Sequence, residues 1–151
     1  MEQAVVVTIL AEPEAIFEVA GRLRPEMFTN RDLALVFRAM LQLYKGSRDI
    51  DMLTIEQEMF AINREHAGQL GGLAFIADQM LKVYSALHIR TYAAWVLRNW
   101  ALRQCIARMS KRIAQASDVH ADVMKLMSEV HRDMQQLEEE FADTSTTRPV
   151  S

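Results

Sequence analysis

Apolar residues recur at helical spacing along most of the chain, and polar segments or glycine and proline separate the runs. Stripes with steps of three and four residues predict amphipathic α-helices. In the first 97 residues the stripes predict a helix near 4–10, one after Pro13, one after Asn30, one from Thr54 and a short one after Gly71. Between the last two we expect a polar loop. The first part of the chain is therefore a set of short helices.

Residues 4–10 are rich in β-branched side chains, which favour strands, yet no partner strand follows. We therefore expect a short buried helix there. Pro13 suits the first turn of the next helix, and Gly21 and Pro25 end that helix. The apolar face of this second helix comprises Ile16, Val19, Ala20 and Leu23.

Three polar or glycine positions predict where the following helices begin and end. Asn30 is a candidate N-cap, and Gly46 stops that helix in the manner of a C-terminal glycine. Thr54 with Gln57 has the spacing of a capping box.

The last third of the chain has a different pattern. Nothing breaks a helix from about residue 88 to 117, and a second helix runs to Phe141 after a polar break at 117–122, with Asp118 as the candidate N-cap. The apolar positions of both helices step by four and three, as in heptad repeats. Two such seams joined by a short loop predict an antiparallel helical hairpin whose seams face each other. The seam residues are Leu102, Ile106, Met109 and Ile113, then Val123, Met127, Val130, Met134 and Leu137.

These patterns predict an all-α chain: a compact multi-helix globule over 1–97, the hairpin over 98–141, and a polar linker or tail over 142–151. Composition agrees, because five glycines and three prolines are too few for the turns of a β-sandwich or barrel. Repeated apolar strands between helices, typical of parallel α/β folds, are missing as well.

The sequence offers little chemistry for catalysis. No glycine precedes a lysine and no GxGxxG occurs, so the usual nucleotide-binding loops are absent. His120 and His131 each have an acidic neighbour, but nothing supplies the three or four convergent ligands that a metal site needs. We expect no catalytic, cofactor-binding or metal-binding residue in this chain.

Cys105 is the single cysteine, which excludes an internal disulfide and fits a reducing cytosol. It lies in mid-helix beside a seam, where a packed thiol is expected. No run of about 18 apolar residues predicts a membrane span, and no basic segment precedes the first apolar run as in a signal peptide. We expect a cytoplasmic protein with no membrane contact.

Charge is uneven along the chain. Residues 98–134 hold 7 basic and 4 acidic side chains, net +3, between two segments that are each net −3. Nearby Trp95 and Trp100 could stack on bases, so a stand-alone helical DNA-binding or replication-accessory protein is an alternative function. The net charge is small for tight binding to phosphates, and we expect a weak or indirect DNA contact. Both tryptophans then fill the junction between globule and hairpin.

The hairpin is better suited to binding protein. Four of the ten methionines lie in it, and Met124, Leu126, Cys105 and Trp100 lie beside the seams. Apolar stripes this wide usually pack on further helices, and methionine adapts to such surfaces. Pairing with the hairpin of a second copy, as a two-fold symmetric four-helix bundle, is the simplest solution.

The chain resembles a known family, the N-terminal domain of bacterial replicative DNA helicases of the DnaB type. The resemblance runs from Glu2 to about Leu137. It departs from the family pattern at Leu33, where a histidine is usual, and at His88, where an asparagine is usual. The motifs that carry it are, in order, Leu23-Arg24-Pro25-Glu26-Met27-Phe28, Val36-Phe37-Arg38-Ala39-Met40, Ile50-Asp51-Met52-Leu53-Thr54, Leu70-Gly71-Gly72-Leu73-Ala74-Phe75-Ile76, Ser85-Ala86 with Tyr92, and Arg103.

The resemblance implies a non-catalytic collar domain of a DNA replication helicase. Such domains pair through their hairpins, as dimers or as a trimer of dimers in a hexamer, and in several bacteria they dock primase; a helicase loader is a further partner. ATP and Mg are then expected only in a motor domain C-terminal to this chain. The candidate primase surface comprises Arg103, Arg108, Lys111, Arg112, Asp118, Asp122 and Lys125.

Overall fold

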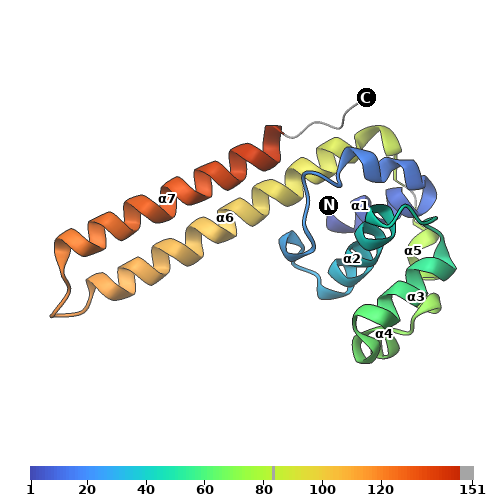
Figure 1. Cartoon of the computed structure of the whole chain (residues 1–151), viewed down its shortest axis with the longest axis horizontal. Helices are drawn as coiled ribbons and strands as arrows, with labels where there is room; N and C mark the ends of the chain where they lie inside the picture. Colours follow the sequence, from blue (N-terminus) through green and yellow to red (C-terminus); the bar gives the residue numbers. More distant parts are fainter. Residues whose placement is uncertain (83, 147–151) are drawn as a thin grey trace.

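A computed structural model of the chain describes residues 1–82 and 84–146. In Figure 1 a helical globule lies at one end and two long antiparallel helices extend from it. This confirms the all-α globule-and-hairpin fold predicted from the sequence. The described elements are α1 Glu2–Ala11, η1 Pro13–Glu18, η2 Pro25–Met27, α2 Arg31–Lys45, α3 Met52–Ile62, α4 Arg64–Leu70, α5 Leu73–Met80, η3 Ala86–His88, α6 Ile89–Ala116 and α7 Val123–Thr146, where η denotes a 3-10 helix.

Helix α1 confirms the expected buried helix near the N-terminus. Ala4 through Ile9 are all buried, so this helix is apolar on every side and lies inside the globule. Its N-terminal end is tied to the start of α2, because the Glu2 carboxylate accepts hydrogen bonds from the backbone N–H groups of Thr29 and Asn30. β-branched residues form a helix here because burial on all sides outweighs their weak strand preference.

The segment after α1 differs from the expected α-helix. Only Pro13–Glu18 is helical, and it is a 3-10 helix, since backbone bonds alternate between three-residue and four-residue spans through this region. Proline at position 25 disfavours the helical conformation for the residue before it. The expected apolar residues nevertheless reach the core: Ile16, Val19 and Leu23 are buried.

Helix α2 begins as expected, with Asn30 Oδ1 accepting from the N–H groups of Asp32 and Leu33 at 2.9 and 3.1 Å. It ends at Gly46, but Gly46 has an ordinary negative φ and the left-handed residue is Ser47, at φ 53°.

Helix α3 starts three residues earlier than expected. Its capping box joins Asp51 and Thr54: Asp51 Oδ1 accepts from the Thr54 N–H, and Thr54 Oγ1 accepts from the Asp51 N–H, both at 2.9 Å. Thr54 is therefore the third helical residue and not the N-cap, because the aspartate three positions before it satisfies the same free N–H groups.

The predicted polar loop before Gly71 is in fact a short helix, α4. Asn63 caps it by accepting from the His66 N–H at 3.0 Å, and its residue Ala67 is buried. Gly71 and Gly72 both have positive φ, 97° and 52°, and they turn the chain into α5 as expected. A side chain on Gly72 would also meet Glu56 Oε1 at 2.8 Å.

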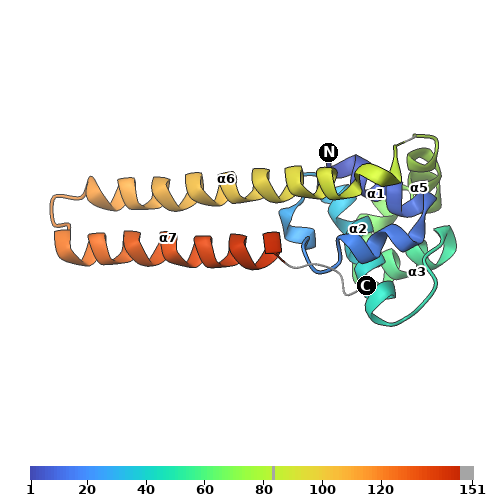
Figure 2. The ribbon, with the colours of Figure 1, turned by 90° about the horizontal axis from the view of Figure 1, so that it is seen from above.

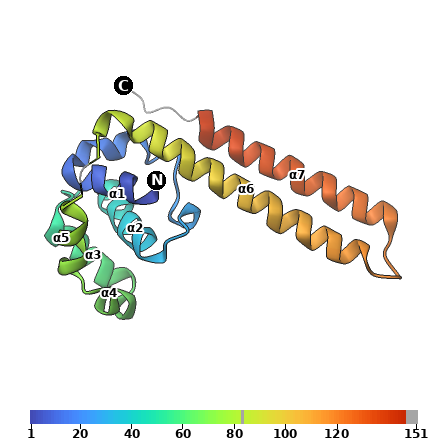
Figure 3. The same ribbon diagram turned by 180° about the vertical axis from the view of Figure 1, so that it is seen from behind.

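Helix α6 belongs to both parts of the molecule. Figures 2 and 3 show it running continuously from the globule to the hairpin tip. Its first half contributes Ile89, Ala93, Val96, Leu97 and Trp100 to the globule core. Arg103 then donates to the backbone carbonyl of Met27 at 2.7 Å, so the base of the hairpin is fixed to the globule by packing and by a charged hydrogen bond.

The loop between α6 and α7 is capped differently from the prediction. Asp122 Oδ1, at the start of α7, accepts from the Lys125 N–H at 3.1 Å, whereas Asp118 accepts from the His120 N–H within the turn. Helix α7 continues to Thr146, beyond Phe141, so residues 142–146 are helical and not a polar tail. Residues 147–151 of the predicted tail lie outside the described residues.

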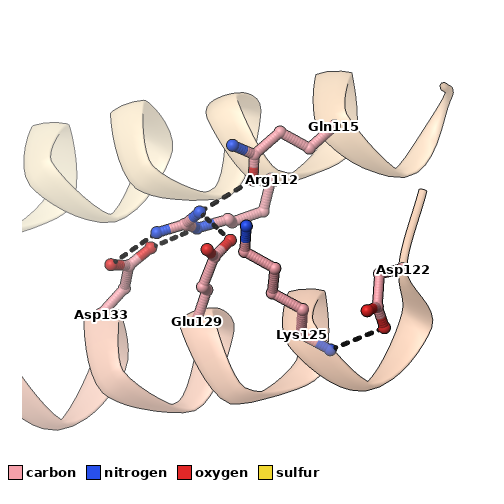
Figure 4. A network of polar contacts seen from close by, with 6 residues as sticks. All are labelled: Arg112, Gln115, Asp122, Lys125, Glu129 and Asp133. Carbon is pink, nitrogen blue, oxygen red and sulfur yellow. Dashed lines mark hydrogen bonds and ion pairs between the residues drawn. The ribbon is translucent and has the colours of Figure 1, made fainter. Parts of the chain in front are cut away.

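A partly buried ion-pair network joins the two helices of the hairpin (Figure 4). Arg112 on α6 binds both carboxylate oxygens of Asp133 on α7, at 2.7 and 3.1 Å, and also Glu129 at 2.7 Å. The Arg112 side chain is only 15% exposed and that of Asp133 16%. Arg108 donates to the Asp133 backbone carbonyl at 2.8 Å. Bidentate guanidinium–carboxylate pairs fix the register of the two helices.

This network shifts the ionisation of its members. The hydrogen bond with Arg112, more than the nearby charges of Arg112, Arg108 and Lys111, holds the pKa of Asp133 below its ordinary value, although partial burial opposes the shift. The pKa of Arg112 is raised, chiefly by its hydrogen bond to Asp133.

We predict that Gly72→Ala lowers the free energy of unfolding by about 1–2 kcal/mol, because alanine at positive φ is strained. The matched control is Gly68→Ala within α4, where a methyl group meets nothing within 4 Å and should stabilise by about 0.5–1 kcal/mol. Denaturant unfolding monitored by circular dichroism measures both. Equal effects of the two substitutions would contradict the conformational argument.

We also predict that Asp133→Asn lowers the thermal stability of the hairpin at pH 7 and that the difference from the parent chain shrinks in acid. A carboxylate whose folded pKa is lowered contributes fully above its ordinary pKa, about 3.9, and loses that contribution as the pH falls through the lowered value. Melting curves at a series of pH values provide the test, with Glu138→Gln on exposed α7 surface as control. A pH-independent difference would refute the ion-pair origin.

Candidate functional site

The nine seam residues are where the structure departs most from the expected hairpin. Seven of them are 38–65% exposed in the single chain, Met134 is half-buried and Leu137 is buried. The two seams therefore do not face each other, and that expectation was wrong. The exposed seven are Leu102, Ile106, Met109, Ile113, Val123, Met127 and Val130.

The reason is that other residues occupy the contact between the two helices. On α6 the contact positions are Ala101, Cys105, Arg108 and Arg112, and on α7 they are Leu126, Glu129, Asp133 and Leu137; none of the eight is among the exposed residues. Seven of the nine seam positions follow a contact position by one residue. The exceptions are Leu137, which is itself a contact position, and Val123, which lies four residues before Met127 on the same stripe. One residue is a rotation of about 100° around a helix, so each seam is turned away from the other helix.

Both seams are nevertheless on the same side of the hairpin. Each is rotated in the same sense from its own contact line, and because α6 and α7 run in opposite directions, this rotation brings both stripes to one face. We call it the apolar face, formed by the seven exposed seam residues. Met134 and Phe141 continue the α7 stripe toward the globule. The face is a contiguous apolar surface of a kind that usually marks an interaction site.

The opposite side of the hairpin is basic. Lys111, Lys125 and Arg132 each precede a contact position by one residue, and all three are exposed. By the same rotation argument they share the face opposite the apolar stripe. We call these three residues the basic face.

The candidate partner surface divides into three groups in the structure. Arg103, Arg108 and Arg112 are occupied within the chain, by Met27, Asp133 and Glu129. Asp118, Asp122 and Lys125 lie together around a hollow of about 190 Å³ at the hairpin tip. Lys111 belongs to the basic face. The predicted surface is thus not one patch, because its arginines hold the hairpin together.

Glu129 and Asp133 are the members of this site that the sequence reading missed. Their spacing of four residues on α7 matches that of Arg108 and Arg112 on α6, which is the available signal for cross-helix pairing.

The tryptophans also differ from each other in their surroundings. Trp100 is 5% exposed and lies at the junction, as expected, with the Arg24 guanidinium 5.3 Å from its ring centroid. Trp95 is 43% exposed, with Arg98 at 5.3 Å. It was expected to fill the junction and instead lines an open groove.

Among residues 1–82 and 84–146, no three His, Cys, Asp or Glu side chains gather in a way that could hold a metal ion. Over the same residues no helix is both long and apolar enough to cross a membrane.

Comparison with known proteins places this geometry in a family. Residues 1–98 match the family model described as DnaB-like helicase N terminal domain. The chain is 31% identical over 134 residues to the replicative DNA helicase DnaB of Rhodothermus marinus. The aligned region covers 89% of this chain and 14% of that protein. It is 30% identical over 132 residues to the replicative DNA helicase DnaC of Bacillus subtilis, covering 87% and 28%.

Solved structures share the fold. The crystal structure of the N-terminal domain of DnaB helicase from Mycobacterium tuberculosis superposes with a TM-score of 0.76 at 25% identity, covering 89% of this chain and 94% of that one. A DnaB-like replicative helicase, described with its interactions with primase, gives 0.72 at 24% identity, covering 92% and 30%. The family match spans well over half of the chain, and the chain accordingly belongs to the DnaB-like helicase N-terminal domain family.

Proposed function

We propose that this chain is the assembly and docking domain of a replicative DNA helicase, working through self-association of its hairpin. The observation that carries the proposal is the apolar face: seven large apolar side chains from two helices that stay 38–65% exposed in the part of the chain that the structure describes. Support also comes from the relatives, which are replicative DNA helicases and of which this chain spans only 14% and 28%.

The physical case for self-association follows from area. Full burial of one exposed Leu, Ile, Val or Met side chain stabilises by about 1.5–3 kcal/mol. The seven residues of the apolar face are about half exposed in the folded chain, so a dimer that covers them would gain part of this free energy at each position. Two apolar faces meeting across a two-fold axis would form a four-helix bundle, in which each face is its own complement. A dimer, or a trimer of dimers in a hexamer, is the assembly we propose.

Primase docking is the second part of the proposal. If the apolar face is covered in the dimer, the basic face remains available for a partner. One structural neighbour is described by its interactions with primase, which supports this part of the proposal. ATP hydrolysis with Mg and the unwinding of DNA would belong to a motor domain outside the region that this chain matches in its relatives, and a cytoplasmic location is part of the same proposal.

The alternative function, DNA binding by the hairpin, is less favoured by the geometry. Of the seven basic side chains between 98 and 134, Arg103, Arg108 and Arg112 already bond within the chain. Fewer of the seven basic side chains are therefore free to contact the phosphates of DNA. Steep salt-dependent binding of single-stranded DNA by this chain would favour the alternative.

We predict that Ile106→Asp abolishes self-association while the chain keeps its helical content, because Ile106 is 65% exposed in the single chain. A carboxylate buried in the bundle should weaken the dimer by at least about 100-fold. Sedimentation velocity over a concentration series measures this. The control is Leu53→Asp, an equally exposed leucine on α3, which should leave the dimer intact. A parent chain that stays monomeric at high micromolar concentration would overturn the proposal.

For docking, we predict that a Lys111→Glu and Lys125→Glu double variant binds the primase of the same organism about tenfold more weakly and still dimerises. Arg64→Glu, an exposed charge on α4, is the control. Calorimetric titration with purified primase gives the affinities. Unchanged binding by the double variant would exclude the basic face as the primase surface.

A further inference from the structure

A groove on the globule has no role in the proposed function. It lies between α2 and the junction of α3 with α4, and its volume is about 330 Å³. Figures 1 and 3 show α4 at the edge of the globule, away from both helices of the hairpin. None of the described residues that line the groove belongs to α6 or α7. The groove is therefore separate from the apolar face and from the basic face.

One wall of the groove is a face of α2. It is lined by Arg31, Ala34, Leu35 and Arg38, and their spacing of three, four and seven residues places them on one side of the helix. The two arginines are exposed at the ends of this face, about 10 Å apart along the helix axis. Between them Ala34 is half-buried and Leu35 is buried, so the middle of the wall is apolar.

The other wall adds an apolar side chain and no negative charge. Ile62, the last residue of α3, is half-buried, and Asn63 and His66 complete the lining. Asp32 is next to Arg31 in the sequence, but its carboxylate binds His66 Nε2 at 2.8 Å. Among the described residues, the lining thus contains two guanidinium groups and no carboxylate. We call this hollow the α2–α4 groove.

The two arginines of the groove lack the carboxylate partners that other arginines of residues 1–97 have. Arg48 pairs with Glu58 and Arg90 with Glu18. Neither Arg31 nor Arg38 forms an ion pair or a hydrogen bond within the part of the chain that the structure describes. Residues 1–97 together carry a net charge of −3, so acidic groups are available nearby. Two free guanidinium groups beside an apolar hollow indicate an anionic partner from outside the chain.

The lining favours an acidic protein segment over a nucleic acid. No Trp, Tyr or Phe ring among the described residues lines the groove, so a base has no platform for stacking. The apolar middle of the groove instead suits an aliphatic side chain. A helix presents residues three, four and seven positions apart on one face, so carboxylates seven residues apart with an apolar residue between them match the α2 wall.

We propose that the α2–α4 groove binds an acidic amphipathic helix of a partner protein. The carboxylates of that helix lie on Arg31 and Arg38, and its apolar side chain enters the hollow between Leu35 and Ile62. Docking of an apolar helix face into a groove is a common mode of recognition, and guanidinium–carboxylate pairs fix the orientation of the bound helix. The inference does not depend on self-association of the hairpin or on the basic face, and it assigns the globule a partner site of its own.

Peptide binding to the whole chain tests the site. The probe is a fluorescein-labelled, alanine-based peptide of about 18 residues, long enough to form a helix, with two glutamates seven residues apart and two leucines between them. We expect an Arg31→Glu and Arg38→Glu double variant to bind it at least about tenfold more weakly than the parent chain. The double variant should instead bind the matching peptide in which lysines replace the glutamates. Fluorescence anisotropy over a concentration series gives the dissociation constants.

Two controls separate the site from general attraction between charges. Lys45→Glu combined with Arg132→Glu changes the net charge of the chain by the same amount at exposed positions outside the groove, and should leave peptide binding unchanged. A probe in which glutamines replace the leucines should bind more weakly to the parent chain, because its apolar contact with the groove is lost.

Several results would overturn the inference. They are no binding of the probe at about 1 mM chain, equal weakening by the control pair, and displacement of the probe by a single-stranded oligothymidylate at lower concentration than by unlabelled peptide. The last result would make a phosphate chain the better ligand. Sedimentation velocity of the Arg31→Glu and Arg38→Glu double variant keeps this test apart from the proposed function, because its hairpin should still self-associate. Loss of self-association would make a second copy the occupant and would also overturn the inference.

Discussion

The structure depends on helix α6 being held at one end and free at the other. Its first turns are packed in the core through Ile89, Ala93, Val96 and Leu97, next to α1, whose residues Ala4 to Ile9 are buried. Because the helix is continuous, this packing fixes the direction in which the hairpin leaves the globule. Arg103 reinforces the exit by bonding the carbonyl of Met27. The proposed self-association needs such rigidity, since the hairpin has to present the same face to each partner.

The second constraint is the polar interior of the hairpin. Arg112 and Asp133 fill space between the helices that leucine would fill in an ordinary coiled coil. Removing two charges from water costs free energy, so such pairs add less stability than apolar packing and more geometric specificity. Here the specificity has a visible consequence. With the interior occupied by charged groups, the apolar stripes lie outside, where a second chain can cover them.

Much of the fold could be predicted from the sequence because the signals are local. The stripe and N-cap of α2, the long uninterrupted run of α6 and the glycine pair before α5 are each a matter of a few neighbouring residues. The failures had local causes too. Helix α4 was missed because its seven residues are mostly polar and only Ala67 is buried. The start of α3 was misplaced because Asp51 and Thr54 can both serve as a cap, and position alone decides between them.

For the candidate site, the sequence by itself determined which residues form the two heptad stripes and that those stripes are too wide for a lone hairpin. The direction in which the stripes point was decided only by the tertiary structure. Periodicity defines which residues share a face of a helix, but it does not define the rotation of that helix about its axis. That rotation is set by contacts between residues far apart in the sequence. Here Arg112 binds the Asp133 carboxylate and Arg108 binds the Asp133 backbone carbonyl. No local pattern encodes these contacts.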